Sequence, residues 1–197
     1  RLMASLRRNG LVDDTLVIFS SDHGDGMGAL QCIGKCCHYD EATRVPFIVS
    51  YPGHIPAGVV DDERLVSSGL DFYATALDYA GLSIPDGCEG LSVRPNEEAP
   101  WRDQVVSELW VAGLKPSEWK GNPLGRMLRT DRYKYVLYDR GEHREQLFDM
   151  RADPGELQSI ASDSTSRGVL EEHRKRLLAW CRSTDDQAGL KMCASLF

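Results

Sequence analysis

The chain has 197 residues, enough for one domain with a sizeable core or for one domain with a small appendage. Its hydrophobic content of 42% and charged content of 27% are ordinary for a globular protein. The net charge of −7 argues against nucleic acid or an anionic membrane as a partner, and no apolar run reaches the roughly 20 residues of a membrane span.

The first elements in chain order are typical of an α/β protein. Residues 1–11, RLMASLRRNGL, read as the last turns of a helix ended by Asn9-Gly10, so we expect the chain to begin partway through an element. Residues 15–20, TLVIFS, form a short apolar and β-branched run of the kind found in a strand buried on both faces. Residues 45–51, VPFIVSY, form a second such run, and a turn-rich loop follows.

Residues 67–82, SSGLDFYATALDYAGL, predict an amphipathic helix. Ser68 with Asp71 predicts a capping pair at its start, and Gly81 predicts its end. Its apolar face should carry Leu70, Tyr73, Ala74, Leu77 and Ala80. Residues 82–104 are rich in Pro, Gly and acidic side chains, which indicates a loop, and residues 105–110 predict a strand.

The character of the chain then changes. Residues 126–139 and 144–150 alternate in the manner of antiparallel strands joined by a turn at 140–143, and residues 168–181 have the period of a helix. We therefore expect an α/β portion over residues 1–125. A small α+β subdomain with an antiparallel sheet and a C-terminal helix should follow over residues 126–197.

Candidate chemical groups gather after the first predicted strand. Asp22 and His23 lie where ligands bind in an open α/β sheet, and their oxygen and nitrogen atoms suit a divalent cation. Lys35 can pair with a sulfate or phosphate oxygen, and His38 can donate to an anionic substrate or leaving group. Each of these residues alone is also compatible with an ordinary polar loop. An ion pair between Arg44 and Asp40 or Glu41 is a structural expectation.

Six cysteines lack a framework spacing, which indicates mostly reduced thiols. A weaker alternative is a zinc site, because thiolates and an imidazole stand close together in the chain. Its ligands would be Cys32, Cys36, Cys37 and His38.

An ordered set of strings resembles the C-terminal half of a sulfatase of the alkaline phosphatase superfamily, over residues 1 to about 180. The strings are DDTLVIFSSDHGD (13–25), Gly34-Lys35 with Tyr39, Glu41 and Arg44-Val45-Pro46, VSYPG (49–53), GLDFYATALDYAG (69–81), EGLSVRP (89–95), LRTDRYKYVLYD (128–139) and EQLFDMRADPGELQSIA (145–161). The resemblance implies the C-terminal part of an alkaline-phosphatase-like α/β/α sandwich. It also implies hydrolysis of a small-molecule or carbohydrate sulfate ester.

By the same resemblance, Asp22 and His23 supply two ligands to one divalent metal, which is usually Ca²⁺, with Mg²⁺ or Mn²⁺ as alternatives. Lys35 contacts the sulfate, and His38 is a further substrate contact. The family's nucleophile is a formylglycine made from Cys or Ser in a Cys/Ser-x-Pro-x-Arg motif. That motif is not among these 197 residues, and the nearest string, Ser50-Tyr51-Pro52-Gly53-His54, lacks the arginine. We therefore expect the chain alone to be inactive.

Two alternatives stay open. Phosphonate monoester hydrolases and phosphodiesterases of the superfamily share an Asp-His-Gly turn after a strand, and sulfate and phosphate are both tetrahedral oxyanions. A truncated or degenerate non-catalytic module is the other alternative. Specificity groups at the pocket rim are a further expectation for the loop around residues 111–125, with Trp110, Lys115, Trp119 and Lys120.

Overall fold

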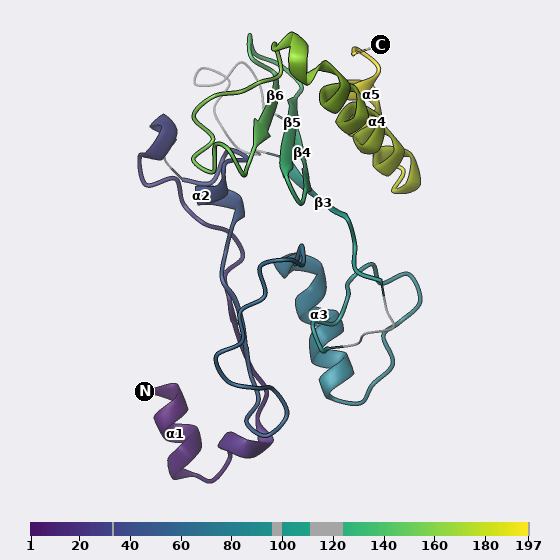
Figure 1. Ribbon diagram of the computed structural model, residues 1–197. Helices are drawn as coiled ribbons and strands as arrows, with labels where there is room; N and C mark the ends of the chain where they lie inside the picture. The colour runs from purple at the N-terminus through teal and green to yellow at the C-terminus, as the bar shows by residue number, and fades with distance from the viewer. Residues whose placement is uncertain (33, 96–99, 111–123, 197) are drawn as a thin grey trace. The chain divides into compact units, whose positions relative to one another are not determined.

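The computed structural model describes residues 1–32, 34–95, 100–110 and 124–196. The chain forms two compact units (Figure 1). Unit 1 comprises Arg1–Asp22 and Val45–Arg102, and unit 2 comprises His23–Arg44 and Asp103–Phe197. The predicted mixture of helices and strands is confirmed, whereas the domain boundary between residues 125 and 126 stays a prediction.

Unit 1 contains the first predicted elements. Helix α1 (Leu2–Arg8) ends before Gly10, whose φ of +65° is a left-handed conformation that glycine adopts without strain. A 3₁₀ turn, η1 (Val12–Asp14), leads into strand β1 (Val17–Ser20). Strand β2 (Phe47–Ser50) pairs with β1 in antiparallel register, with Val17 opposite Ser50 and Ser20 opposite Phe47.

The prediction that residues 15–20 are buried on both faces is wrong. Phe19 is 60% exposed, and its cross-strand partner Ile48 is 56% exposed. The reason is that β1 and β2 form a two-stranded sheet among the described residues, and two strands cannot cover both of their own faces.

Helix α3 (Ser68–Tyr79) is confirmed in extent, but two details of its prediction are wrong. Its N-cap is Ser67, and the Asp71 carboxylate accepts the Ser67 amide at 2.7 Å, so Ser68 makes no capping pair. Leu70 and Tyr73 are 43% and 52% exposed, while the buried residues of the helix are Asp71, Ala74 and Thr75.

Polar contacts around Asp71 explain which face of α3 is buried. Asp71 is fully buried, and its Oδ1 atom accepts from Arg102 Nη2 at 2.7 Å and from the Leu91 amide at 2.8 Å. Trp101, the residue before Arg102, donates from its Nε1 atom to the Leu65 carbonyl at 3.0 Å. The helix therefore packs on the loop over residues 90–102 through a paired charge, which a periodicity count of apolar residues does not detect.

Unit 2 is built on a four-stranded antiparallel sheet in the order β3-β4-β5-β6. Its strands are β3 (Gln104–Trp110), β4 (Leu124–Thr130), β5 (Tyr133–Tyr138) and β6 (Glu145–Asp149). The alternating pattern predicts antiparallel strands over residues 126–139 and 144–150, and the first of these divides into β4 and β5. The strand predicted at residues 105–110 is confirmed as β3, which pairs with β4 in this sheet. The register places Leu128 opposite Tyr135 and Tyr135 opposite Leu147. These three side chains therefore share one face, which we call the helix-covered face.

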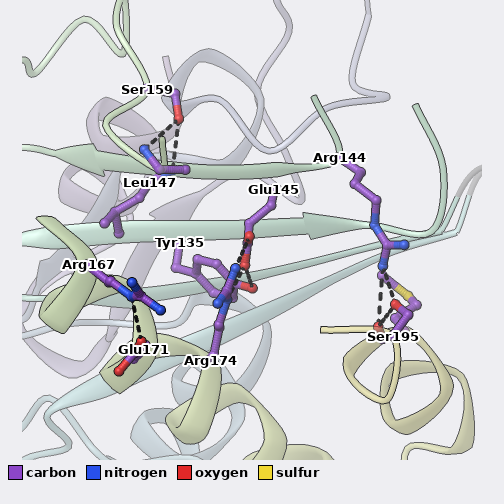
Figure 2. Close-up of polar contacts among 11 residues, drawn as sticks. Tyr135, Arg144, Glu145, Leu147, Ser159, Arg167, Glu171, Arg174 and Ser195 are labelled. Carbon is purple, nitrogen blue, oxygen red and sulfur yellow. Dashed lines mark hydrogen bonds and ion pairs between the residues drawn. The ribbon is translucent and has the colours of Figure 1, made fainter. Parts of the chain in front are cut away.

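Helices α4 (Arg167–Ser183) and α5 (Gln187–Cys193) cover that face, with the 3₁₀ turn η3 (Ser164–Ser166) before them (Figure 1). The core contains Leu128, Tyr135, Leu137 and Leu147 from the sheet, and Leu170, Leu177, Cys181, Met192 and Cys193 from the helices. Glu145 fixes α4 to the sheet, because it accepts from Tyr135 Oη and Arg174 Nε, each at 2.7 Å (Figure 2). Arg144 donates to Ser195 Oγ at 2.8 Å, just after α5.

The opposite face of the sheet, the loop-covered face, packs against residues 37–42. On this face Gly125 lies opposite Tyr138, and Lys134 lies opposite Phe148. Tyr39 packs edge-on against Phe148 with ring centroids 6.2 Å apart, and the short helix α2 (Asp40–Thr43) follows. The sheet of unit 2 is therefore covered on both faces.

No helix in the described part of the chain is both long enough and apolar enough to cross a membrane.

Candidate functional site

Residues 23–32 and 34–35 form a tight hairpin-like loop in unit 2. The Gly26 amide donates to the Gly34 carbonyl at 2.8 Å, and the Gly28 amide donates to the Cys32 carbonyl at 2.9 Å. Asp25 Oδ1 accepts the Met27 amide at 2.8 Å within the same turn. A 3₁₀ turn, η2 (Ala29–Gln31), closes the loop at its tip. These bonds bring the segment around Lys35 back beside the segment around His23.

Lys35 and His23 meet across this loop. Lys35 Nζ lies 2.6 Å from His23 Nε2, and His23 Nδ1 lies 2.7 Å from the Gly24 carbonyl oxygen. A carbonyl can only accept, so Nδ1 carries the proton and Nε2 presents its lone pair to the ammonium. The imidazole is therefore held in the tautomer that offers Nε2 to a cation.

Glycine is required beside His23 for steric reasons. A Cβ atom on Gly24 would lie 1.9 Å from the Glu41 carbonyl oxygen, which is far inside contact distance. The Gly24 amide donates to the Ala42 carbonyl at 2.9 Å. The backbone of residues 41–42 therefore sets the position of the residue that follows His23.

Asp22 is exposed and its Oδ1 atom accepts from Ser21 Oγ at 3.4 Å. Asp22 ends the first segment of unit 1 and His23 begins unit 2. A carboxylate oxygen and an imidazole nitrogen are each suitable donors for a divalent cation, and the metal role of the two residues stays a prediction. The described residues contain no group of three or more His, Cys, Asp or Glu side chains that could hold a metal. A complete site would need ligands from elsewhere.

His38 does not lie in the exposed loop with Lys35. It is only 2% exposed, its ring packs against Tyr138 with centroids 5.8 Å apart, and a Cβ on Gly125 would touch its Nε2 at 2.8 Å. Burial lowers the pKa of His38 to about 4. The charges of Lys134 and Arg126 lower this pKa further, while the Gly125 backbone raises it. Neither ring nitrogen has a well-aligned hydrogen-bond partner among the described residues. Its predicted contact with substrate stays a prediction.

The cysteines near Lys35 do not gather into a four-ligand cluster within the described residues. Cys32 Sγ lies 2.9 Å from Cys37 Sγ, whereas Cys36 is exposed and Cys37 is buried. Burial and the Cys32 contact raise the pKa of Cys37 to about 12, so the thiol of the metal-free chain is protonated at neutral pH. The arrangement favours reduced thiols over a zinc centre.

Three further features concern an expected ion pair, the expected pocket-rim residues and an ionic group that the sequence did not predict. Arg44 pairs with Asp40 at 4.0 Å, which confirms the expected ion pair. Trp110 is 72% exposed at the end of β3, whereas Lys115, Trp119 and Lys120 lie outside the described residues. The sequence reading missed a buried ionic group in which Lys134 contacts both Asp40 and Glu156.

Residues 28–183 match the family described as N-sulphoglucosamine sulphohydrolase, C-terminal. The chain belongs to the sulfatase family. This match covers the Lys35 segment, the sheet of unit 2 and helix α4, so the resemblance read from the sequence is confirmed.

Relatives and solved structures agree with this assignment. The chain is 37% identical to a Delta 4,5-hexuronate-2-O-sulfatase of Bacteroides thetaiotaomicron, over 92% of this chain and 38% of the relative. It superposes on a structure described as a 2-O GAG sulfatase with a TM-score of 0.84 and 32% identity, covering 95% of this chain and 40% of that one. A phosphonate monoester hydrolase from Silicibacter pomeroyi gives a TM-score of 0.78 at 31% identity, covering 93% and 38%.

These likenesses confirm the predicted fold class, the C-terminal part of a sulfatase α/β fold with its antiparallel subdomain. The chain spans about two fifths of the length of the relatives that it matches.

Proposed function

We propose that this chain is the part of a sulfuric ester hydrolase that binds the sulfate group and contributes ligands to a divalent metal. The observation that carries the proposal is the Lys35–His23 pair, 2.6 Å apart, in a chain of the sulfatase family. Residues 1–125 would belong to the catalytic α/β domain, and residues 126–197 to the C-terminal subdomain.

Each residue has a distinct chemical task in this proposal. Lys35 is exposed, so its ammonium is accessible to a sulfate oxygen and can balance charge that develops on it. His23 keeps its Nδ1 proton on the Gly24 carbonyl and offers Nε2 as a ligand. Asp22 offers a carboxylate. One imidazole lone pair serves one partner at a time, so Lys35 pairs with His23 only where no metal takes Nε2.

Relatives in this superfamily generally use a divalent metal. We propose Ca²⁺ as the metal here, with Mg²⁺ or Mn²⁺ as alternatives, because the donor at Asp22 is a hard carboxylate oxygen. When bound, the cation would neutralise charge on the transferring sulfuryl group. A formylglycine nucleophile would come from outside these 197 residues.

A sulfated carbohydrate is the proposed substrate class, since the named relative is a sulfatase of a hexuronate. A phosphonate monoester is the second candidate. It is favoured by the structural likeness to the Silicibacter pomeroyi enzyme, at 31% identity. Both substrates present a tetrahedral oxyanion to Lys35, so the geometry at this lysine does not separate them.

The test begins with the gene upstream of Arg1, which should encode a Cys/Ser-x-Pro-x-Arg motif. The protein that includes this upstream part is then assayed with a 2-O-sulfated unsaturated hexuronate, an aryl sulfate and an aryl phosphonate monoester. We expect kcat/KM for a sulfate ester to exceed that for the phosphonate. A preference for the phosphonate would support the second candidate, and no upstream motif would contradict sulfatase activity by the formylglycine route.

A further inference from the structure

A buried ionic group links the loop of unit 2 to its sheet. The Lys134 side chain on β5 is 1% exposed, and its Nζ pairs with the Asp40 carboxylate and with Glu156 Oε1, the latter at 2.8 Å. The same Nζ donates to the His38 carbonyl at 3.1 Å. Glu156 is also 1% exposed, and its Oε2 accepts the Asp40 amide at 2.6 Å. We call Lys134, Asp40 and Glu156 the ionic clamp.

The clamp joins three segments that are far apart in the chain. Asp40 begins α2, Lys134 lies in β5, and Glu156 follows the Asp153-Pro154 turn after β6. Burial raises the pKa of Glu156, while the Lys134 ammonium and the Asp40 amide oppose the rise. Buried charges are costly unless they are paired and hydrogen-bonded, so the three groups depend on one another for their positions.

A continuous set of contacts leads from the clamp to the candidate site. Asp40 opens the short helix α2, which contains Ala42, a residue only 3% exposed. The Ala42 carbonyl accepts the Gly24 amide at 2.9 Å, and Gly24 holds the Nδ1 proton of His23 through its own carbonyl. His23 Nε2 then meets Lys35 Nζ. Only α2 and one backbone hydrogen bond separate the clamp from the His23–Lys35 pair.

We propose that Lys134 and Glu156 are positioning residues that hold α2 on the sheet and thereby fix the tautomer and place of His23 beside Lys35. That this pair serves catalysis rests on the proposed function. The ordering of the His23–Lys35 pair by the clamp is independent of the proposed function. Amide exchange and imidazole spectroscopy measure this order without any substrate. A failure of the clamp can therefore be told apart from a failure of the proposed function.

The test substitutes Glu156→Gln, which keeps the shape and one oxygen for the Asp40 amide but removes the charge opposite Lys134. The matched control is Asp186→Asn, an equally conservative change in another buried pair of the same unit. Asp186 pairs with Arg126 at 2.7 Å and accepts the Gly189 amide at 3.0 Å, on the helix-covered face. Both variants are studied as the full chain by native-state amide hydrogen exchange.

In Glu156→Gln we expect exchange of the Gly24 amide to rise roughly tenfold, because the charged partner that holds α2 is lost. The ¹⁵N shifts of His23 should move from a single Nδ1–H tautomer to a mixture. In Asp186→Asn the Gly189 amide should exchange faster, while Gly24 stays within about twofold of the parent chain. This pattern distinguishes local positioning from a general loss of stability.

The proposal is overturned if Gly24 exchange and the His23 shifts are unchanged in Glu156→Gln, or if Asp186→Asn changes them as much. If Glu156→Gln does not fold, Asp40→Asn decides the question, because it leaves the Lys134–Glu156 pair in place. The expected effect there is a roughly threefold rise in Gly24 exchange. No rise in a folded Asp40→Asn chain would overturn the proposal.

Discussion

The two units differ in how they bury apolar side chains. Among the described residues, Ala74 is the one buried hydrophobic residue of unit 1, while unit 2 buries a core that runs from Leu128 to Cys193. Unit 1 instead exposes Phe19 and Ile48, and its most buried side chains include the charged Asp71. Unit 1 is therefore ordered largely by polar contacts and unit 2 by packing.

The comparison shows why similar strands behave differently. The sheet of unit 2 has α4 and α5 on one face and residues 37–42 on the other, so both faces lose contact with water. Strands β1 and β2 have only each other within the described residues. Since apolar burial is the main stabilising term, unit 2 should be the more stable of the two.

The largest expected effect is that of Asp71→Ala in unit 1. Removing the carboxylate leaves Arg102 and the Leu91 amide without their buried acceptor, which costs about 3–5 kcal/mol. Hydrogen exchange should show α3 losing protection while β4 and β5 keep theirs. Asp78→Ala is the matched control in the same helix. It should cost only about 1 kcal/mol, because its pair with Arg94 is partly exposed and its other partner is the uncharged Ser92 hydroxyl. If both variants lost the same free energy of unfolding, the buried Asp71 contacts would not be the main support of unit 1.

A truncation in the core should be next in size. Leu147→Ala removes a fully buried side chain of β6 on the helix-covered face and should destabilise unit 2 by about 3 kcal/mol, as measured by denaturant unfolding. Phe19→Ala, at a 60% exposed position of unit 1, should cost under about 1 kcal/mol. A larger loss for Phe19→Ala would show that the exposed face of β1 is covered in solution.

The smallest of the three stability effects is a pH dependence in unit 2. Burial lowers the pKa of His38 from 6.5 to about 4. Below pH 6.5 the His38 imidazole therefore binds a proton in the unfolded chain but not in the folded chain. The free energy of unfolding of unit 2 therefore has its full value above pH 6.5 and falls as the pH drops toward 4. The expected fall is about 2 kcal/mol between pH 7 and pH 5.

The measurement is denaturant unfolding of the parent chain and of His38→Asn at both pH values. The substitution should reduce this fall. The residual fall includes His173, whose pKa is also lowered by burial. The same fall in both chains would show that His38 does not titrate as described.

The sequence predicted strands and helix α4 in unit 2, because alternation and helical period are local signals, but it did not predict the short helices α2 and α5. Met127, Val136 and Phe148 are apolar on one face, and Leu128, Leu137 and Leu147 are apolar on the other, which already indicates two covered faces. The pattern could not identify residues 37–42 as the second cover. That contact joins residues about 100 positions apart, as between His38 and Tyr138.

At the candidate site, the resemblance supplied Asp22, His23 and Lys35, and the structure brings His23 and Lys35 together. It did not indicate that His38 is buried, or that Lys134 and Glu156 lie beneath α2. A lysine amid apolar strand residues signals a buried charge that must have an acidic partner. Which carboxylate fills that role depends on tertiary contacts that spacing does not encode.

The most direct measurement is kcat/KM for a sulfate ester in the protein that includes the upstream part, comparing Lys35→Ala with the parent. Lys175→Ala, at an exposed lysine on α4, is the control. We expect Lys35→Ala to lower kcat/KM about 100-fold with no loss of stability, and Lys175→Ala to leave it unchanged. A value for Lys35→Ala within about twofold of the parent would contradict a sulfate-binding role for the loop of unit 2.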